Sequence, residues 1–503
     1  MNASAGSTLS SAADVAFTTA RQQAVADALL VILPPACVLW RSEDTRPYEC
    51  DGLAAYRQLP MIVALPENEA QIIAVLKLCR QMQVPIVPRG AGTGLSGGAL
   101  PIVNGVVLST AKLKQIIEVN PLARTAVVQP GVRNLSISEA AAPHGLYYAP
   151  DPSSQIACTI GGNVAENSGG VHCLKYGLTV HNVLRVRVIT MAGEVVELGS
   201  AALDAPGLDL LAVFIGSEGM LGIVTEVTVK LVPKPHLARV IMASFDDVAK
   251  GGDAVAGVIA AGIIPAGLEM MDRTSSRMVE PFVHAGYDID AAAILLCESD
   301  GTLEEVEEEI AHMSAVLKTS GATKIEVSQN EEERLRFWSG RKNAFPAAGR
   351  ISPDYYCMDG TIPRKQLASV LQGISDMGEK YGLRCANVFH AGDGNLHPLI
   401  LFDANQPGEF HRAELFGAEI LELCVALGGT ITGEHGVGIE KINSMCVQFS
   451  EAEREAFFGV KRAFDPDCLL NPNKAIPTLV RCAEYGKMHV RYGQLKFSDL
   501  PRF

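Results

Sequence analysis

A glycine-rich segment near residue 90 constrains the fold of this chain more than any other feature. Five glycines fall within nine residues of the segment PRGAGTGLSGGALP, which runs from Pro88 to Pro101. Backbone with so few side chains can curl until successive N–H groups point at one anion, and nothing blocks the approach of that anion. Arg89 adds a positive charge beside the first glycine. The segment therefore predicts a phosphate or pyrophosphate cradle.

The same segment contains a literal match to the Gly-x-Gly-x-x-Gly fingerprint of dinucleotide-binding proteins, at Gly92, Gly94 and Gly97. That fingerprint requires a helix that opens directly from the loop, because the helix N-terminus holds the pyrophosphate. Here the loop continues through Pro101 into GVVLS at 105–109, an apolar run typical of a strand. The context disfavours a nicotinamide-dependent dehydrogenase, and it equally disfavours a merely flexible surface loop.

Two further segments supply glycines and small polar side chains. The stretch from Tyr148 to Gly177 contains two glycine pairs with hydroxyl and amide side chains between them, which suits hydrogen bonding to a flat polar ligand. The segment from Gly216 to Pro233 is a glycine turn followed by an alternating run that predicts a long strand. Upstream, residues 61–88 predict a strand, an amphipathic helix and a second strand.

The three glycine segments resemble the flavin-binding segments of the vanillyl-alcohol-oxidase/PCMH flavoprotein family, and the resemblance runs from about Trp40 to the C-terminus. It implies an α+β fold, with a PCMH-type FAD-binding domain of two α+β lobes and a cap domain whose antiparallel sheet is covered by helices. Pro233 and Pro235 mark the first boundary. We expect an N-terminal segment packing on the FAD domain, the FAD-binding domain, the substrate or cap domain, and a C-terminal segment returning to the FAD domain, at 1–55, 56–235, 236–435 and 436–503.

The resemblance also implies which residues contact FAD. Some family members tether FAD through a histidine in the first glycine loop, but this sequence has Thr93 and no histidine there, so we expect non-covalent FAD. The residues expected at the cofactor are Pro88, Arg89, Gly90, Ala91, Gly92, Thr93, Gly94, Leu95, Ser96, Pro150, Asp151, Ser154, Thr159, Gly161, Gly162, Asn163, Ala165, Asn167, Ser168, Gly169, Gly222, Ile223, Val224 and Asn471.

Two histidines flank a turn in the motif NVFHAGDGNLHPLI. Asp393-Gly394 between apolar runs predicts a hairpin with a two-residue turn. That register places His390 opposite His397, and cross-strand partners lie close enough on one face to share a divalent ion. The alternative is a pair of core histidines hydrogen-bonded to backbone carbonyls.

A second motif, GEHGVG, follows a run (GGTIT, 428–432) that we expect to end a strand. Its Glu434 would complete a set of two imidazoles and one carboxylate, which leaves coordination positions open for a substrate. In the 2-hydroxy-acid branch of the family, the residues matching His390, His397 and Glu434 hold zinc or a similar metal, and the residue matching His435 acts as base. Ligand type alone does not separate zinc, manganese and iron. A metallohydrolase would use the same ligands but would have no use for the glycine-rich cradles.

Arg341 lies in the motif FWSGRKNAFP, from which family members place an arginine on the substrate carboxylate. A guanidinium forks onto a carboxylate with two parallel hydrogen bonds. Relatives that oxidise larger hydroxy-diacids carry three polar residues where this chain has Phe345, Cys357 and Leu399. We therefore expect oxidation of a small 2-hydroxy acid, glycolate to glyoxylate, by hydride transfer to flavin. D-lactate and D-2-hydroxyglutarate are the alternatives.

Composition limits the partners and the compartment. The 503 residues are 48% hydrophobic and 19% charged, which predicts two large folded domains. A formal net charge of −14 argues against nucleic acid, and no apolar run is long enough to predict a transmembrane segment. The 12 cysteines include no Cys-x-x-Cys pair, so an iron–sulfur relay must come from elsewhere. The resemblance implies a glycolate-oxidising complex with a second flavin-type subunit and an iron–sulfur subunit. These partners would hold a cytoplasmic protein at the inner membrane and pass electrons to quinone.

Overall fold

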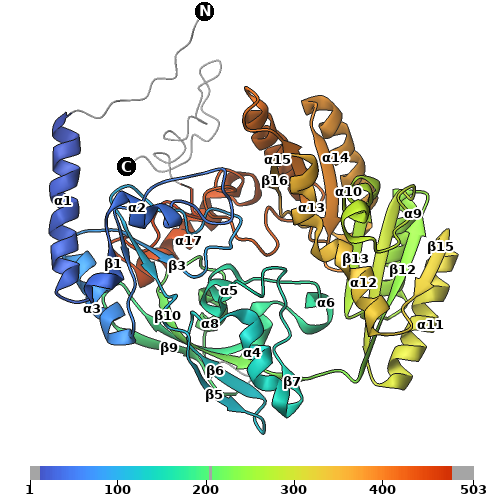
Figure 1. Cartoon of the computed structure of the whole chain (residues 1–503), viewed down its shortest axis with the longest axis horizontal. Helices are drawn as coiled ribbons and strands as arrows, with labels where there is room; N and C mark the ends of the chain where they lie inside the picture. The colour runs from blue at the N-terminus through green and yellow to red at the C-terminus, as the bar shows by residue number, and fades with distance from the viewer. Residues whose placement is uncertain (1–11, 203–206, 478–503) are drawn as a thin grey trace, which may run out of the picture.

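The computed structural model describes residues 12–202 and 207–477, which form the two halves seen in Figure 1. The half on the left of that view contains two lobes, and the half on the right is built on one large sheet. The first and last parts of the expected N- and C-terminal segments, 1–11 and 478–503, lie outside the described residues.

The first lobe is a four-stranded sheet in the order β1-β2-β4-β3. Its strands are β1 (Val38–Leu39), β2 (Ile62–Ala64), β3 (Ile86–Arg89) and β4 (Val106–Ser109). Both β2 and β3 run parallel to β4, and α3 (Glu69–Gln81) connects them. The Asn68 side chain caps α3 by accepting from the Gln71 N–H at 3.0 Å. The predicted strand–helix–strand unit is confirmed, and α1 (Ala12–Leu30) packs beside it.

The second lobe is a five-stranded antiparallel sheet in the order β5-β6-β10-β8-β9. Its strands are β5 (Ile116–Asn120), β6 (Thr125–Val128), β8 (Val183–Ile189), β9 (Val195–Gly199) and β10 (Ile223–Lys230). The long strand predicted after Gly216 is β10, and two register shifts interrupt its pairing with β8. The helices of this lobe are α4 (Asn134–Ala141), α5 (Ile160–Glu166), α7 (Thr179–Asn182) and α8 (Leu210–Phe214). Two short strands, β7 (Leu146–Tyr147) and β11 (Val232–Pro233), pair with each other where the chain leaves this lobe.

The other half is a seven-stranded antiparallel sheet in the order β15-β12-β14-β13-β17-β18-β16. Its strands are β12 (Leu237–Phe245), β13 (Gly267–Asp272), β14 (Ala293–Gly301), β15 (Lys324–Val327), β16 (Asp354–Cys357), β17 (Arg384–Phe389) and β18 (Pro398–Phe402). This antiparallel sheet covered by helices agrees with the expected cap.

Helices cover both faces of the cap sheet, because alternate residues of its strands point to opposite sides. Ile241, Ala243 and Phe245 of β12 face one core, whereas Val240 and Met242 face the other. The first core is closed by α9 (Val248–Ala260), α11 (Leu303–Thr319), α14 (Leu367–Tyr381) and α15 (Glu409–Ala426). The second is closed by α10 (Arg273–Val283), α12 (Glu331–Lys342) and α13 (Ala344–Ile351). The second face is the one that carries the site.

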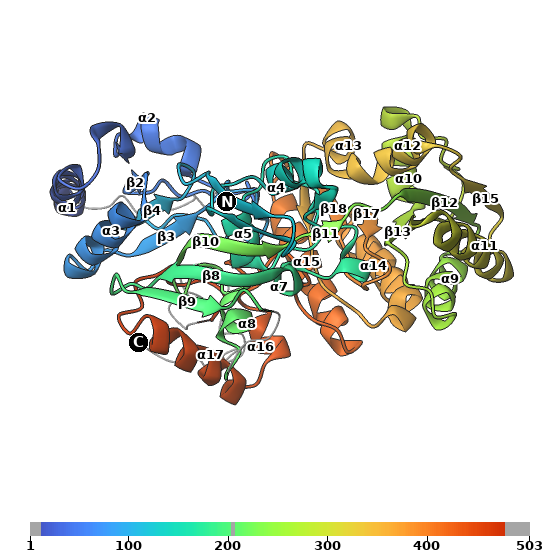
Figure 2. The ribbon, with the colours of Figure 1, turned by 90° about the horizontal axis from the view of Figure 1, so that it is seen from below.

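After α15 the chain crosses back to the first half. The N–H groups of Val437 and Gly438 donate to Glu218 at 2.7 Å, and the Ile439 N–H donates to the Ser96 carbonyl at 3.0 Å. Beyond α16 (Met445–Gln448) and α17 (Glu451–Phe464), Ile86 of β3 bridges to Leu470. Figure 2 shows α16 and α17 lying against the first half of the molecule. Residues 436–477 therefore complete the lobes that residues 12–233 begin.

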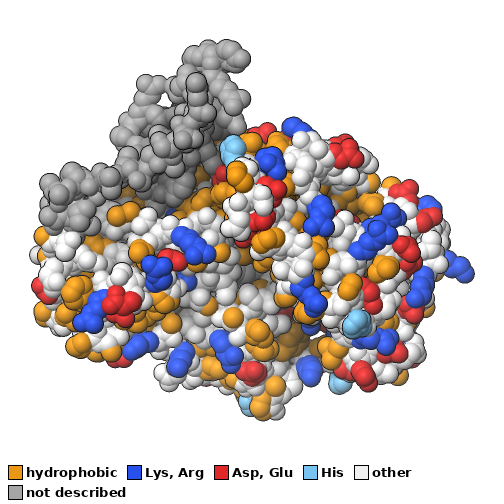
Figure 3. Space-filling view, turned by 45° about the horizontal axis from the view of Figure 1, so that its top comes forward, with side chains coloured by type: hydrophobic (Ala, Val, Ile, Leu, Met, Phe, Trp, Pro, Cys, Tyr) orange, Lys and Arg blue, Asp and Glu red, His pale blue; other side chains and the backbone are white. Residues whose placement is uncertain are grey.

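The surface carries charges of both signs. On the face shown in Figure 3, Lys and Arg side chains are interspersed with Asp and Glu, and no broad area has a single sign. Within residues 12–202 and 207–477, none of the helices is both long and apolar enough to cross a membrane.

Candidate active site

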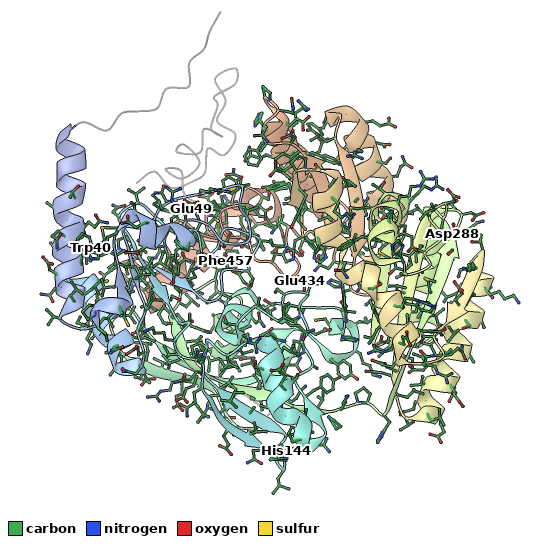
Figure 4. The ribbon with its side chains drawn as sticks, viewed as in Figure 1. Trp40, Glu49, His144, Asp288, Glu434 and Phe457 are labelled. Atoms are coloured by element: carbon green, nitrogen blue, oxygen red, sulfur yellow. The ribbon has the colours of Figure 1, made fainter. Side chains whose placement is uncertain are left out.

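One cavity of about 570 Å³ runs between the two halves of the molecule. Figure 4 labels Glu434 near the middle of the molecule, where the halves meet. The cavity wall includes the glycine-rich loop after β3, the start of α5, the turn before β10, and the cluster of His390, His397, Glu434 and His435. The predicted cofactor loops and the predicted metal ligands thus share one continuous space.

The first glycine loop connects β3 to β4 without a helix, so the context that the dinucleotide fingerprint needs is absent. Gly92 and Gly97 adopt φ values of 73° and 75°, a region that favours glycine. Arg89 is buried, donates from Nη1 to the Cys50 carbonyl at 2.7 Å, and lies over the Tyr48 ring. Arg89 therefore braces the loop as well as lining the cavity.

Most residues expected at the cofactor line this cavity. They are Pro88, Arg89, Gly90, Ala91, Gly92, Thr93, Gly94, Leu95, Ser154, Thr159, Gly161, Gly162, Asn163, Ala165, Ser168, Gly222, Ile223 and Val224. Six others are not among the residues that line it: Ser96, Pro150, Asp151, Asn167, Gly169 and Asn471. Several of these hold the loops in place. Asn471, for example, donates to the carbonyls of Gly98 and Glu218 at 2.9 and 2.7 Å.

The histidine hairpin has a different register from the predicted one. Asn387 of β17 pairs with Pro398 of β18, and the ladder continues to a bridge between His390 and Asn395. The loop therefore has four residues, 391–394, and the prediction that His390 faces His397 was wrong. The Gly392 N–H donates to the Leu268 carbonyl at 2.9 Å, a contact with β13 that a local motif cannot anticipate.

His390 and His397 nevertheless lie on the same face of the sheet. His397 is two residues beyond Asn395, the partner of His390, so the two side chains are diagonal neighbours. Their ring centroids are 5.1 Å apart. Nε2 of His390 is 3.1 Å from Oε1 of Glu434, and Nε2 of His397 is 3.2 Å from the same oxygen. One ligand atom from each residue lies within 4.8 Å of the other two.

The loop that carries Glu434 is organised by Asp359. Its Oδ2 accepts from the Thr432 hydroxyl at 2.5 Å and from the backbone N–H groups of Gly433 and His435 at 3.1 and 2.9 Å. The strand expected at GGTIT reduces to a single bridge between Thr430 and Thr361. Hydrogen bonds from the loop to the Asp359 carboxylate therefore take the place of the strand pairing that the sequence suggested.

Burial and neighbouring charges set the protonation of the cluster. Burial lowers the pKa of His435 to about 4, with only partial compensation from Asp359, so this imidazole is neutral near pH 7. Burial also opposes the charged form of His390, but the carboxylates of Glu269 and Glu434 outweigh it and raise its pKa to about 10. A bound cation would have to displace that proton, because metal ligation needs a neutral imidazole nitrogen.

Arg341, at the end of α12, is buried and lines the cavity. Its Nε donates to Oε2 of Glu269 at 2.6 Å, and Oε1 of Glu269 lies 2.6 Å from Nδ1 of His390. Lys342, the next residue of the motif, also lines the cavity but is exposed. Arg341 and His390, which were predicted from separate motifs, are therefore joined by one carboxylate.

Comparison with known proteins identifies the family. A model of the FAD linked oxidases, C-terminal domain, matches residues 234–475, and a model of the FAD binding domain matches residues 60–199. The glycolate oxidase subunit GlcD of Escherichia coli is 62% identical over 490 residues, which is 97% of this chain and 98% of that protein. This chain belongs to the FAD-linked oxidases. It is accordingly an FAD-dependent oxidoreductase.

More distant relatives of this FAD-linked oxidase agree with the fold. The D-lactate dehydrogenase of Anaerostipes hadrus is 31% identical, with coverage of 88% of this chain and 95% of that protein. A structure of p-cresol methylhydroxylase superposes with a TM-score of 0.78 at 18% identity, with coverage of 91% of this chain and 97% of the other. The expected PCMH-type α+β fold is confirmed.

The cavity of this oxidase has buried polar atoms that suit the expected cofactor. The hydroxyl oxygens of Thr159 and Ser217 are buried without a hydrogen-bond partner in the described part of the chain, and both residues line the cavity. Buried polar groups normally find partners, so these hydroxyls fit a bound polar ligand such as FAD. Both ring nitrogens of His397 are also buried and make no hydrogen bond of good geometry within the described residues, although Nε2 lies 3.2 Å from Oε1 of Glu434. This arrangement fits a cation shared with His390 and Glu434.

Sequence reasoning missed the acids that surround the predicted residues. Glu269 and Asp359 position the cluster, and Asp51, Glu166 and Glu218 line the cavity. Burial and the negative charges of Glu218 and Asp51 hold the pKa of Glu166 well above its usual range. The available signal was a lone acid inside an apolar run, as in GLEMM (267–271), because a buried carboxylate needs a partner.

Proposed function

We propose that this FAD-linked oxidase oxidises glycolate to glyoxylate in the cavity between its two halves. The observation that carries the proposal is the single cavity that joins the glycine loops, the His390–His397–Glu434 cluster and Arg341. A cofactor held by the loops and a substrate held by Arg341 would then share one space. The 62% identity to the glycolate oxidase subunit GlcD supports glycolate as the substrate.

In this proposal each polar residue has one task. Arg341 binds the substrate carboxylate through its terminal nitrogens, which make no hydrogen bond within the described residues, while Nε is held by Glu269. A divalent ion on His390, His397 and Glu434 would favour ionisation of the substrate hydroxyl, and FAD, when bound, supplies the acceptor for the hydride from Cα. His435 accepts the hydroxyl proton as the carbonyl forms.

A second group of possible ligands shares His397. Asp359, His397 and His435 also place their ligand atoms within 4.8 Å of one another. Oδ2 of Asp359 is already occupied by loop donors, and its Oδ1 is 3.6 Å from His397, longer than the contacts of Glu434. We therefore assign the ion, whether zinc, manganese or iron, to the group with Glu434 and leave His435 free as base.

Electrons must leave the reduced flavin through a partner subunit or a diffusible acceptor. The sequence has no closely spaced set of cysteines that could hold an iron–sulfur cluster. We propose non-covalent FAD and a complex with a second flavin-type subunit and an iron–sulfur subunit, which would hold this cytoplasmic chain at the inner membrane. Purified chain that reduces quinone unaided at full rate would contradict that assembly.

We also propose the division into segments 1–55, 56–235, 236–435 and 436–503. The matched FAD-binding region at 60–199 lies within the second segment, and the cap sheet begins at Leu237. The contacts of Val437, Gly438 and Ile439 with the first half support a return of the chain after residue 435.

The test is anaerobic mixing of the purified flavoprotein with glycolate, D-lactate, L-lactate and D-2-hydroxyglutarate while the flavin absorbance is followed. Glycolate should bleach the flavin fastest. Faster bleaching by D-lactate would favour the second candidate, which the D-lactate dehydrogenase of Anaerostipes hadrus supports. Reduction of added NAD would revive the dinucleotide alternative, and a preparation without flavin absorbance would overturn the proposal.

A further inference from the structure

Glu269 lies in the middle of β13 and is only 1% exposed. Its neighbours Leu268 and Met270 point into the apolar core on the other face of the sheet. A carboxylate this deeply buried is costly unless charged or hydrogen-bonding partners surround it. The residues that contact Glu269 must therefore offset the cost of burying its carboxylate.

Both partners of Glu269 belong to the proposed active site. Its Oε1 lies 2.6 Å from Nδ1 of His390, and its Oε2 accepts from Nε of Arg341 at 2.6 Å. A carboxylate only accepts, so His390 must carry its proton on Nδ1 when it is neutral. Nε2, which faces Glu434, is then the nitrogen with a free lone pair. The same carboxylate occupies Nε of Arg341, whereas the terminal nitrogens of the guanidinium make no hydrogen bond within the described residues.

A second buried carboxylate provides an internal comparison. Glu298 on β14 lies on the same face of the sheet and also joins a histidine to an arginine, through His172 at 3.2 Å and Arg334 at 2.8 Å. It accepts from Trp338 of α12 as well, at 2.5 Å. Neither Glu298 nor His172 lines the cavity. The two acids therefore anchor the same helix, but only Glu269 contacts a proposed metal ligand.

We infer that Glu269 is a positioning residue that couples the metal site to the substrate-binding arginine. Glu269 sets the tautomer of His390 for ion binding and the orientation of Arg341 for the substrate carboxylate. Its single negative charge acts on both side chains. This inference rests on the proposed function for the role of Arg341, whereas the link to His390 can be tested on ion binding alone.

Glu269→Gln separates the two hydrogen bonds, because an amide offers one acceptor and one donor where both partners need an acceptor. If the amide oxygen keeps Arg341, the NH₂ group faces Nδ1 of His390 and forces the proton onto Nε2. We expect the affinity of ion-depleted flavoprotein for Zn²⁺ and Mn²⁺ to fall about 10- to 100-fold, the usual effect of removing a partner of a metal-ligating histidine. Competition with a chromophoric chelator measures this without any turnover.

Glu298→Gln is the matched control, since it removes the same charge from the same face of the sheet and also releases α12. Its ion affinity should stay within twofold of wild type. Under saturating ion, Glu269→Gln should lower kcat while the KM for glycolate does not rise, because Arg341 keeps its charge and loses a competing anion. A general loss of packing would instead raise KM in both variants.

Arg341→Leu completes a double-mutant cycle. Without the guanidinium, the charge of Glu269 acts on His390 alone, so Arg341→Leu should tighten ion binding several-fold in the wild-type background and not in Glu269→Gln. An equal effect in both backgrounds, or unchanged ion affinity in Glu269→Gln, overturns the coupling. If Glu269→Gln does not fold, the ion affinity of the Arg341→Leu variant alone tests the inference. Ion affinity equal to that of wild type in Arg341→Leu would then contradict it.

The failure of this inference can be told apart from failure of the proposed function. Wild-type protein that binds ions but is not bleached by glycolate would refute the function, while the chelator competition still reports on Glu269. Wild-type protein that is bleached by glycolate but binds neither Zn²⁺ nor Mn²⁺ would refute the coupling and leave the oxidation standing.

Discussion

Gly94 offers a clean test of the first glycine loop as a cofactor cradle. A Cβ added at this position would meet only Oε1 of Glu166, at 3.8 Å, which is an ordinary van der Waals contact. The backbone of Gly94 also does not adopt a positive φ. Gly94→Ala should therefore leave the apoprotein as stable as wild type, within about 0.5 kcal/mol. The residue lines the cavity, however, so the new methyl group occupies space that a ligand would use.

The expected cost falls on FAD binding. Forcing one extra methyl into a well-packed contact costs about 1–3 kcal/mol, which corresponds to FAD affinity about 5- to 150-fold weaker. Titration of apoprotein with FAD, followed by flavin fluorescence, measures the affinity, and thermal unfolding of the apoprotein measures the stability. Unchanged FAD affinity in Gly94→Ala would refute the placement of the cofactor against this loop.

Two other glycines serve as controls with opposite expectations. Gly97 has a φ of 75° and its added Cβ would lie 2.5 Å from Ile439, so Gly97→Ala should destabilise the apoprotein itself. Gly459 lies inside α17 with nothing within 4 Å, so Gly459→Ala should raise the stability by about 1 kcal/mol and leave FAD affinity unchanged. The three variants separate backbone strain, helix propensity and ligand contact.

The remaining predictions concern the proposed catalytic groups and the buried acids. His435→Ala should keep its flavin spectrum and ion affinity but lose flavin reduction by glycolate about 10²- to 10⁴-fold; normal bleaching would remove His435 from the reaction. Dialysis against a chelator should abolish bleaching without releasing flavin, and added Zn²⁺ or Mn²⁺ should restore it; full activity after verified ion removal would contradict the metal assignment. Burial raises the pKa of Glu166 well above 4.5, so the folded state holds this proton longer than the unfolded state as pH rises. Glu166→Gln should therefore stabilise the apoprotein relative to wild type, by a margin that widens above about pH 4.5 in thermal unfolding; a constant margin would contradict the shift.

Local patterns predicted the elements that local forces determine. The buried stripe of Ile72, Val75, Leu76 and Cys79 gave α3, because helical periodicity alone decides which side faces the core. The same periodicity is present in α11, where Val306, Ile310, Met313 and Leu317 are buried, but Leu303 at the start of the helix is 49% exposed. Near a helix terminus fewer neighbours pack against a side chain, so helical periodicity does not predict burial there.

The histidine hairpin shows where local patterns fail. Asp393-Gly394 favours a two-residue turn when only the two flanking strands compete. In the protein, the loop is also held by β13 through Leu268 and by Arg364, which donates to the Gly392 carbonyl. These contacts select the four-residue loop. The two imidazoles still lie on one face of the sheet, because the pairing register is shifted by two residues and such a shift leaves each side chain on the same face.

The acids Glu269 and Asp359 were missed for a different reason. Each is a single carboxylate in an apolar run, and its partners are distant in sequence, 121 residues for His390 and 72 for Arg341 in the case of Glu269. No periodicity links such residues. The pairing of β13 with β17 brings Glu269 next to His390, and Arg341 reaches it from α12. The ligands could be found from their own chemistry, whereas the residues that orient them required the sheet order.

The position of Glu434 explains why the two halves of the molecule must meet for the site to exist. His390 and His397 are fixed by the cap sheet, whereas Glu434 stands a few residues before Val437 and Gly438, whose N–H groups are held by Glu218 of the first half. Three ligands on one rigid element would bind an ion regardless of the domain arrangement. Here the loop that carries Glu434 is held at Gly433 and His435 by Asp359, next to β16 of the cap sheet, and at Val437 and Gly438 by Glu218 of the first half. We therefore expect the affinity of the proposed ion site to depend in part on how the cap docks against the glycine loops. The same docking closes the cavity in which Arg341 and those loops face each other, which ties the binding of an ion to the assembly of the space where the oxidation is proposed to occur.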